Sequence, residues 1–193
     1  LLKRTTAQDY AAIIRETGLP LFVKPNKGGS SLGTTFVKTA DQLPAAIASA
    51  FEHDDEALAE SYIKGTELTC GVYSKSGEPF ALPVTEIVSK SEAAFFDFKA
   101  KYTRGMADEI TPARIPVELA LKVQETTVWL YKAFCLKGLA RIDYIFSEGK
   151  LFFLEINLTP GMADTSIVPQ QAAVAGIPIK EIFTELIQSA LGA

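Results

Sequence analysis

Polar and apolar residues alternate along two short segments in the carboxyl-terminal third of the chain. The polar positions are Arg141, Asp143, Glu155 and Asn157. The apolar positions beside them are Ile142, Tyr144, Phe146, Phe152, Leu154 and Ile156. A half-buried β-strand has this period because successive side chains point to opposite faces. Gly149 lies between the segments and favours a tight turn, so the pattern predicts a β-hairpin with one polar face.

The requirement that the polar residues share a face also suggests the register of this hairpin. If Ser147 opposes Leu151, Asp143 lies opposite Glu155, and Arg141 and Asn157 form the next polar pair. A shift of one residue would divide the polar residues between the two faces. We therefore expect the register in which the two carboxylates face each other.

Opposed carboxylates repel each other unless a cation neutralises them. The Cβ atoms of such a pair lie about 5 Å apart. A hard cation such as Mg²⁺ accepts two carboxylates and the amide oxygen of Asn157, with water or phosphate as its other ligands. The alternative is a polar outer face on which Arg141 forms a local salt bridge. The alternation by itself leaves both interpretations open.

The same reading predicts the other elements of the chain. Helices are expected over residues 6–17, 41–51 and 117–134, followed by two closing helices, and strands over 21–25, 34–37, 57–63, 67–73 and 80–88. Residues 89–111 show no clear period and are expected to form a long functional loop. This order predicts an α+β protein with antiparallel sheets and helices to one side. We expect a small subdomain of residues 1–62 and a larger one of residues 63–193.

Composition narrows the classes of function. The 193 residues are 48% hydrophobic and carry a net charge of −4, which argues against nucleic acid or an anionic membrane as the main partner. No apolar run has the length of a membrane span. Two isolated cysteines, Cys70 and Cys135, suggest neither a disulfide framework nor a zinc site, and we expect a cytoplasmic protein. The chain begins without Met, which suggests a cleaved or engineered fragment.

A glycine-rich segment, residues 28–33, lies between two predicted strands. It lacks the Gly-Lys-Ser/Thr ending of a P-loop, yet it offers unhindered backbone N–H groups and the hydroxyls of Ser30 and Ser31. Lys24, on the strand before it, could add a positive charge. The segment therefore suggests a loop that covers a polyphosphate, and a hairpin turn without a ligand is the alternative.

Two further segments suggest binding functions. The strand that contains Glu60 runs through Ser61, Tyr62 and Ile63 into a turn, and its backbone could meet an adenine edge while Glu67 binds ribose hydroxyls. An ordinary strand is the alternative. Residues 95–102 are rich in aromatic side chains, which suits a lid that closes over a reactive intermediate. The alternative is an irregular loop packed on the sheet.

The chemistry expected at these segments must proceed without histidine, because His53, the one histidine, is expected to be solvated at a helix end. Residues 157–162 follow the hairpin directly, and Ser166 is expected to begin a helix whose N-terminal N–H groups favour a carboxylate. Positioning and charge stabilisation by metal, lysine and arginine then remain, as in phosphoryl transfer.

Taken together and in order, these motifs resemble those of the ATP-grasp ligases, and among them the D-alanine–D-alanine ligases. The shared residues are Phe22-Val23-Lys24-Pro25, Gly29-Ser30-Ser31-Leu32-Gly33, Glu60, Gly65, Glu67, residues 97–102, residues 138–143, Glu155-Ile156-Asn157, Pro160-Gly161-Met162, Ser166 and Pro169. The ordered set covers nearly the whole chain and is highly specific.

The resemblance implies an ATP-grasp fold, with two α+β subdomains that enclose ATP, and an enzyme that joins two D-alanines through an acylphosphate for cell-wall (peptidoglycan) precursors. It implies a role for each of the following residues. ATP would be held by Lys24, Ser30, Ser31, Glu60, Ser61, Tyr62, Ile63 and Glu67. Two Mg²⁺ ions, or Mn²⁺ in their place, would be held by Asp143, Glu155 and Asn157. The oxyanion would be stabilised by Arg141 and Gly161, the second D-alanine would be bound by Ser166 and Ile167, and the closing loop would contain Lys101 and Tyr102.

The sequence also departs from the family pattern. Leu158 stands where a small hydroxyl residue usually follows the Asn, and Phe96 replaces a common Tyr. The amino-terminal substrate domain of the family and its first phosphate-binding lysine have no counterpart in this sequence, so we expect poor turnover by this chain alone. An ATP-grasp ligase with another acceptor, or an ATP-binding module without turnover, remains an alternative, and a homodimer is one oligomeric state that stays open.

Overall fold

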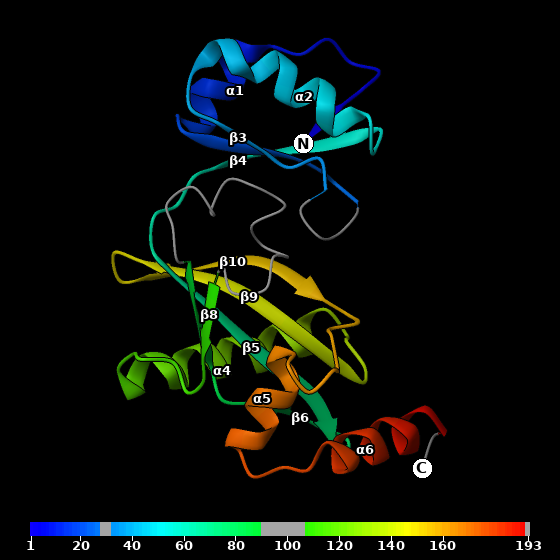
Figure 1. Cartoon of the computed structure of the whole chain (residues 1–193). Helices are drawn as coiled ribbons and strands as arrows, with labels where there is room; N and C mark the ends of the chain where they lie inside the picture. Colours follow the sequence, from blue (N-terminus) through cyan, green and yellow to red (C-terminus); the bar gives the residue numbers. More distant parts are fainter. Residues whose placement is uncertain (28–31, 90–106, 192–193) are drawn as a thin grey trace. The chain divides into compact units, whose positions relative to one another are not determined.

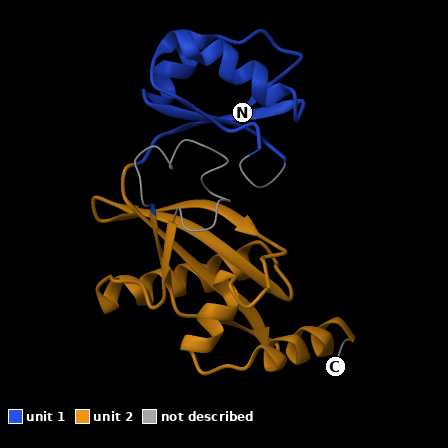
Figure 2. Cartoon of the chain, viewed as in Figure 1, with its two compact units in different colours: residues 1–63, 89–106 blue, residues 64–88, 107–193 orange. Residues whose placement is uncertain are grey.

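The computed structural model of the protein describes residues 1–27, 32–89 and 107–191. The chain forms two compact units, shown in separate colours in Figure 2. Unit 1 comprises residues 1–63 and 89–106, and unit 2 comprises residues 64–88 and 107–193. None of the helices among the described residues is long and apolar enough to cross a membrane.

Unit 1 is a four-stranded sheet covered on one face by two helices (Figure 1). Its elements are β1 (Leu2–Lys3), α1 (Tyr10–Thr17), β2 (Leu21–Pro25), β3 (Thr35–Val37), the 3-10 helix η1 (Ala40–Gln42), α2 (Leu43–Phe51) and β4 (Glu56–Ser61), and the strand order is β1-β4-β2-β3. Alternate strand residues such as Leu21 and Val23 are fully buried and pack with α2, while Ile13 and Ile14 of α1 pack against the same cluster. The other face of the sheet therefore remains for polar and aromatic side chains.

The first helix is shorter than the sequence predicts. It begins at Tyr10 rather than Thr6, because the Asp9 side chain accepts a hydrogen bond from the Ala12 N–H (2.9 Å) and so caps the helix there. Gly18, with a φ of 73°, ends it as expected. The strand over residues 21–25 is confirmed, and β4 ends at Ser61 instead of Ile63.

Unit 2 is built on a six-stranded sheet. Its elements are β5 (Thr66–Lys75), β6 (Glu78–Ala81), β7 (Thr85–Ser89), β8 (Ala107–Ile110), α4 (Val117–Ala133), β9 (Leu139–Ser147), β10 (Lys150–Asn157), α5 (Ile167–Val174) and α6 (Ile179–Leu191). The strand order is β10-β9-β5-β7-β8, and β6 also pairs with β5. The pairs of β9 with β10 and of β5 with β6, β7 and β9 are antiparallel, as predicted.

Three predictions for unit 2 were wrong. The single strand expected over 80–88 is divided into β6 and β7, which both pair with β5. Residues 107–110, expected to be loop, form β8. Helices lie on both faces of the sheet instead of one: α4 packs on the face of Leu68 and Ile142, and α5 and α6 cover Tyr73, which alternates onto the other face of β5. Part of that second face is left for the polar residues.

The hairpin of β9 and β10 has the predicted polar pairing but reaches it by a different route. Ser147 pairs with Lys150 rather than Leu151, so the turn contains only Glu148 and Gly149, which both have positive φ (49° and 77°). Such a turn alone would place Asp143 opposite Leu154. A β-bulge between Phe153 and Glu155 adds one residue to β10 and restores the pairing of Asp143 with Glu155.

The bulge also changes which side chains of β10 face the core. Leu151 and Ile156 pack against the same buried cluster although they are five positions apart, a spacing that would put them on opposite faces of a regular strand. The bulge reverses the alternation between them. Glu155 and Asn157 consequently lie on the face that carries Arg141 and Asp143.

Candidate active site

The polar face of unit 2 is organised around the carboxylate of Asp143. Arg141 donates to both of its oxygens, from Nε to Oδ1 and from Nη2 to Oδ2, each at 2.9 Å. Asn157 Nδ2 donates to Asp143 Oδ2 at 2.9 Å and lies 3.5 Å from Glu155 Oε1. The hydroxyl of Thr69, the cross-strand partner of Asp143 on β5, donates to Oδ1. The four residues predicted from the alternation thus lie together.

Burial on the opposite face fixes the orientation of Asp143. Its neighbours Ile142 and Tyr144 are fully buried against α4. The Tyr144 hydroxyl lies 2.7 Å from the Thr127 hydroxyl of that helix, and burial raises the pKa of Tyr144. Because the strand cannot turn over without exposing these two residues, Asp143 is held on the polar face.

Among the residues that the structure describes, three carboxylates act on the single guanidinium of Arg141. Burial alone would lower the pKa of Arg141, but the hydrogen bonds that Arg141 donates to Asp143 and the attraction by Asp143, Glu155 and Glu109 raise it above its ordinary value. Arg141 therefore stays charged and can neutralise only part of the negative charge of three carboxylates. The local field favours binding of a further cation.

The donor set fits a hard cation. Among the described residues no group of three or more His, Cys, Asp or Glu side chains could hold a metal ion. Two carboxylates and one amide are present instead, which suits Mg²⁺ bound together with water or phosphate. Asn157 now directs its NH₂ group to the carboxylates, so rotation of its amide would be needed to present the oxygen to an ion.

The residues predicted to bind the second substrate lie at the start of α5. Ser166 is the N-cap of this helix and its side chain makes no capping hydrogen bond, while Ile167 is the first helical residue. A Cβ atom placed on Gly161 would lie 2.8 Å from Ser166 Oγ, so only glycine lets this hydroxyl approach the backbone so closely. A hydroxyl at a helix N-terminus that makes no capping hydrogen bond suits a carboxylate.

On unit 1 the face of the sheet that lies away from the helices carries a charged pair and an aromatic cluster. Lys24 Nζ lies 2.7 Å from Glu60 Oε2. Phe22, Phe36 and Tyr62 contact one another, with ring centroids 5.0–6.1 Å apart. An aromatic surface next to a lysine and a carboxylate can accept the flat face and polar edge of a base.

The other residues to which the sequence analysis assigned a position or role lie partly in the two units and partly outside the described residues. Ser30, Ser31, Lys101 and Tyr102 lie outside the described residues. Ser61 ends β4, and its hydroxyl donates to the Thr17 carbonyl (2.7 Å), which occupies it within unit 1. Glu67 lies on β5 two residues before Thr69 and hence on the same face. His53 is exposed, as expected.

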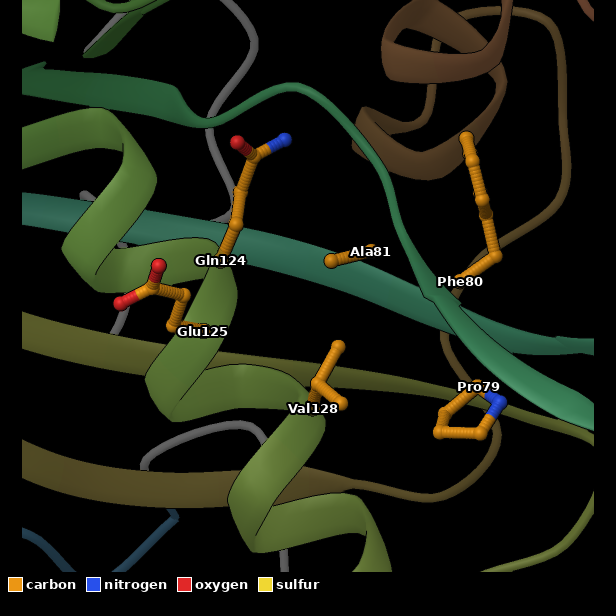
Figure 3. A pocket seen from close by; sticks show the side chains of 6 residues that line it. All are labelled: Pro79, Phe80, Ala81, Gln124, Glu125 and Val128. Carbon is orange, nitrogen blue, oxygen red and sulfur yellow. The ribbon is translucent and has the colours of Figure 1, made fainter.

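Figure 3 shows a hollow between β6 and α4 that is not part of this polar face. It is lined by Pro79, Phe80, Ala81, Gln124, Glu125 and Val128. The lining is mainly apolar, and its one ionisable group, Glu125, is a carboxylate. Such a surface does not favour binding of a phosphate.

Two residues of the polar face were missed by the sequence reading. Thr69 contacts Asp143, and Glu109 of β8 accepts a hydrogen bond from Gln170 (2.8 Å) and attracts Arg141. The alternation of Glu67, Thr69 and Gly71 along β5 contained a signal for Thr69. No such signal existed for Glu109, because its segment shows no regular period.

Comparison with known proteins identifies the family. The family described as D-ala D-ala ligase C-terminus matches residues 2–188. The chain belongs to this family. A D-alanine–D-alanine ligase of Phocaeicola vulgatus is 49% identical over 92% of the chain and 54% of its own length, and one of Bacteroides fragilis is 46% identical over 98% and 58%. The chain thus spans about half the length of the curated relatives it matches.

Solved structures agree with the family and the fold. A D-alanine–D-alanine ligase from Bacillus anthracis has a TM-score of 0.80 at 32% identity, covering 98% of this chain and 59% of that one. The VanG D-Ala:D-Ser ligase from Enterococcus faecalis has a TM-score of 0.82 at 36% identity, covering 96% and 54%. The predicted ATP-grasp fold, with two α+β units and antiparallel sheets, is confirmed.

Proposed function

We propose that the chain is the ATP-binding and metal-binding part of a D-alanine–D-alanine ligase. The observation that carries this proposal is the polar face of unit 2, where Arg141, Asp143, Glu155 and Asn157 meet in a chain that belongs to the family of such ligases. The product would be a precursor of cell-wall peptidoglycan, made in the cytoplasm. Neither nucleic acid nor a membrane is needed as a partner.

Unit 1 binds the nucleotide in this proposal. Lys24 carries the positive charge for the phosphates, and Ser30 and Ser31 add hydroxyl and N–H donors. The aromatic cluster of Phe22, Phe36 and Tyr62 and the Glu60 carboxylate suit an adenine ring. The backbone of Ser61 to Ile63 contributes polar groups at the edge of the base. A bound ATP complex of a Bacillus anthracis ligase, 28% identical to this chain with a TM-score of 0.80, supports ATP as the nucleotide.

Unit 2 supplies the metal ligands and the groups that act on the amino acids. Asp143, Glu155 and Asn157 hold Mg²⁺, which when bound neutralises charge on the phosphates. Glu67 binds the ribose. Arg141 and the Gly161 N–H stabilise the oxyanion, and Ser166 with Ile167 hold the carboxylate of the second D-alanine. Lys101 and Tyr102 belong to the segment that closes over the substrates.

The reaction has two steps. A carboxylate oxygen of the first D-alanine attacks the γ-phosphorus of ATP. The bond between this phosphorus and the oxygen that bridges it to the β-phosphate breaks, ADP departs, and an acylphosphate is formed. The amine of the second D-alanine then attacks the acyl carbon, loses a proton, and expels inorganic phosphate to give the dipeptide. Arg141 holds the negative charge that develops on the carbonyl oxygen in the second step, and exclusion of water protects the acylphosphate.

A different acceptor is the second candidate function. The VanG neighbour, named a D-Ala:D-Ser ligase, is 36% identical to the chain, slightly more than the 32% of the Bacillus anthracis D-alanine–D-alanine ligase. The curated relatives at 45–50% identity are named D-alanine–D-alanine ligases, which favours D-alanine.

Calorimetry and product analysis test the proposal. We expect the chain to bind Mg·ATP but to release phosphate slowly with D-alanine. Correct orientation of the first substrate lowers the barrier by roughly 7–11 kcal/mol, and in this proposal part of that orientation comes from the further sequence that the relatives contain. Mass spectrometry of the product with D-alanine or D-serine separates the two acceptors. Failure to bind Mg·ATP would contradict the proposal, and rapid D-alanine-dependent turnover by residues 1–193 would contradict the expected dependence on further sequence.

A further inference from the structure

The side-chain amide of Gln171 takes the place of a backbone peptide group within the sheet of unit 2. On one edge β5 pairs with β7 through Glu67–Thr69 and with β6 through Val72–Lys75. Between these two partners the Gly71 N–H donates to Gln171 Oε1 at 2.9 Å. Gln171 Nε2 in turn donates to the Thr69 carbonyl at 3.0 Å. The amide therefore bridges the gap that β6 and β7 leave beside β5.

Gln171 is fully buried and its polar atoms are well satisfied. Besides the Thr69 carbonyl, Nε2 donates to the Thr85 hydroxyl of β7 at 3.0 Å. A Cβ atom on Gly71 would lie only 2.7 Å from Gln171 Oε1, so a glycine at position 71 is what admits the amide. Loss of the amide would leave the Gly71 N–H and the Thr69 carbonyl buried without partners, which is unfavourable.

Thr69 links this arrangement to the polar face. Its carbonyl accepts from Gln171, and its hydroxyl donates to Asp143 Oδ1. Gln171 lies on α5, whose N-cap is Ser166. One buried side chain thus connects the helix that Ser166 caps with the residue that hydrogen-bonds to Asp143.

We propose that Gln171 is a positioning residue that fixes Thr69 so that its hydroxyl orients Asp143 for metal binding. The inference rests on the proposed function of Asp143 as a metal ligand. Residues that orient a metal ligand commonly change metal affinity by about 10- to 100-fold when they are replaced. A residue that merely packs α5 onto the sheet would change stability and leave the metal affinity unaltered.

The test compares Gln171→Met with Ile182→Val in the full chain. Ile182 is fully buried in the cluster beneath α5 and α6, so its truncation lowers stability without touching Thr69. Electron paramagnetic resonance measures Mn²⁺ binding with a saturating non-hydrolysable ATP analogue, and thermal unfolding measures stability. We expect the Mn²⁺ dissociation constant to rise about tenfold in Gln171→Met and to stay unchanged in Ile182→Val, although both unfold at lower temperature.

Two further variants show whether the effect passes through Thr69. Thr69→Val removes the hydroxyl with little change of shape, and it should weaken Mn²⁺ binding by a similar factor. The double variant Thr69→Val/Gln171→Met should be no weaker than either single variant, since both break the same chain of contacts. Gln171→Glu, which keeps the acceptor for Gly71 but loses the donor, replaces Gln171→Met if the latter does not fold.

The outcomes are distinct. A folded Gln171 variant with unchanged Mn²⁺ affinity, or additive losses in the double variant, would overturn the positioning role alone. A wild-type chain that binds the nucleotide but no Mn²⁺ would overturn the proposed metal site, and the positioning role with it.

Discussion

Lys24 and Glu60 form an ion pair across the neighbouring strands β2 and β4, with Nζ 2.7 Å from Oε2. Their side chains are 26% and 42% exposed, so the pair is partly solvated and contributes little to stability. Its effect is to hold the ammonium group over the sheet face that also carries Phe22. A lysine fixed in this way is positioned to bind an anionic ligand. Its replacement should therefore change the affinity for the ligand without much change in the stability of the fold.

Replacing Lys24 by Met should therefore weaken ATP binding much more than folding. A hydrogen bond to a charged group is worth about 1.5–3 kcal/mol, so we expect the dissociation constant of Mg·ATP to rise on the order of 10- to 100-fold. The free energy of unfolding should change by less than about 1 kcal/mol. Calorimetric titration and urea unfolding measure the two quantities.

Lys3 offers a matched control for this variant. It also lies on a strand of unit 1 and approaches a carboxylate, with Nζ 3.9 Å from Glu56 Oε1, but its side chain is 60% exposed. Lys3→Met should leave the affinity for Mg·ATP unchanged. Equal losses in both variants would mean that general charge, rather than the position of Lys24, governs binding.

The β-bulge leads to a prediction about deletions in β10. Leu154 is the extra residue, so its deletion should give a regular strand in which Asp143 still pairs with Glu155 and Asn157 stays on the polar face. Deletion of Ile156 shortens the strand equally but turns Asn157 toward the core. We expect the first variant to retain Mn²⁺ binding within a few-fold and the second to lose it, as measured by paramagnetic resonance. Loss in both would contradict this account of the bulge.

This hairpin also shows how far the sequence determines the structure. The alternation of polar and apolar residues could be recognised in the sequence because burial of Ile142 and Tyr144 forces the polar residues onto the other face. The two-residue turn could not be predicted, because Glu148 has a φ of 49°, a conformation that a glutamate seldom adopts. The predicted turn was one residue too long and the bulge was missed. These two errors cancel, so the pairing of Asp143 with Glu155 was correct.

Long-range contacts could not be predicted from the sequence, for a different reason. Helix α4 could be predicted because local period and length define it, and it spans Val117–Ala133 as expected within one residue. The contact of Gln171 with Gly71 joins residues 100 positions apart, and neither has a local pattern that requires the other. The division of one apolar segment into β6 and β7 likewise depends on how both pair with β5.

Glu86 gives a prediction about pH. Hydrogen bonds from the Arg114 side chain, at 2.9 and 3.1 Å, hold the pKa of its carboxyl below the ordinary value of 4.5. A lowered pKa in the folded state stabilises the protein above the unfolded pKa, and this stabilisation is lost as the pH falls through the folded value. Glu86→Gln should therefore lower the free energy of unfolding at pH 7. The loss should be only about 1 kcal/mol, because the Arg114 side chain is largely exposed and solvent screens the pair. The difference from the wild type should shrink below pH 4.5.

Urea unfolding followed by the fluorescence of Trp129, the one tryptophan, reports on unit 2, where Glu86 lies. Glu78→Gln is the control, because its pair with Lys132 is exposed on both sides (79% and 60%). It should have no measurable effect at either pH. A Glu86→Gln difference that persists unchanged at pH 3 would show that the charge of Glu86 is not the cause.

Asp54 holds the start of the glycine-rich segment, and this contact gives the last prediction. Its carboxylate accepts from the Lys27 N–H at 2.7 Å and from the Glu56 N–H at 3.3 Å, and the bond to Lys27 is the main cause that lowers its pKa. At the other end, Gly33 has a φ of 71°, and a Cβ there would lie 2.5 Å from His53 Cδ2. Lys27, just before the segment, is thus held by Asp54, and Gly33 lies close to His53.

If residues 28–33 bind phosphate, the hydrogen bond that holds Lys27 should raise the affinity by reducing the entropy that binding removes. We expect Asp54→Ala to raise the dissociation constant of Mg·ATP on the order of tenfold, which corresponds to about one hydrogen bond. Asp55→Ala is the matched control, since its side chain is 84% exposed and contacts Arg4 instead. Calorimetry on both variants decides the matter. Normal affinity in Asp54→Ala would mean that this anchor serves only the fold of unit 1, while a loss confined to Asp54→Ala would place phosphate binding at the segment that it holds.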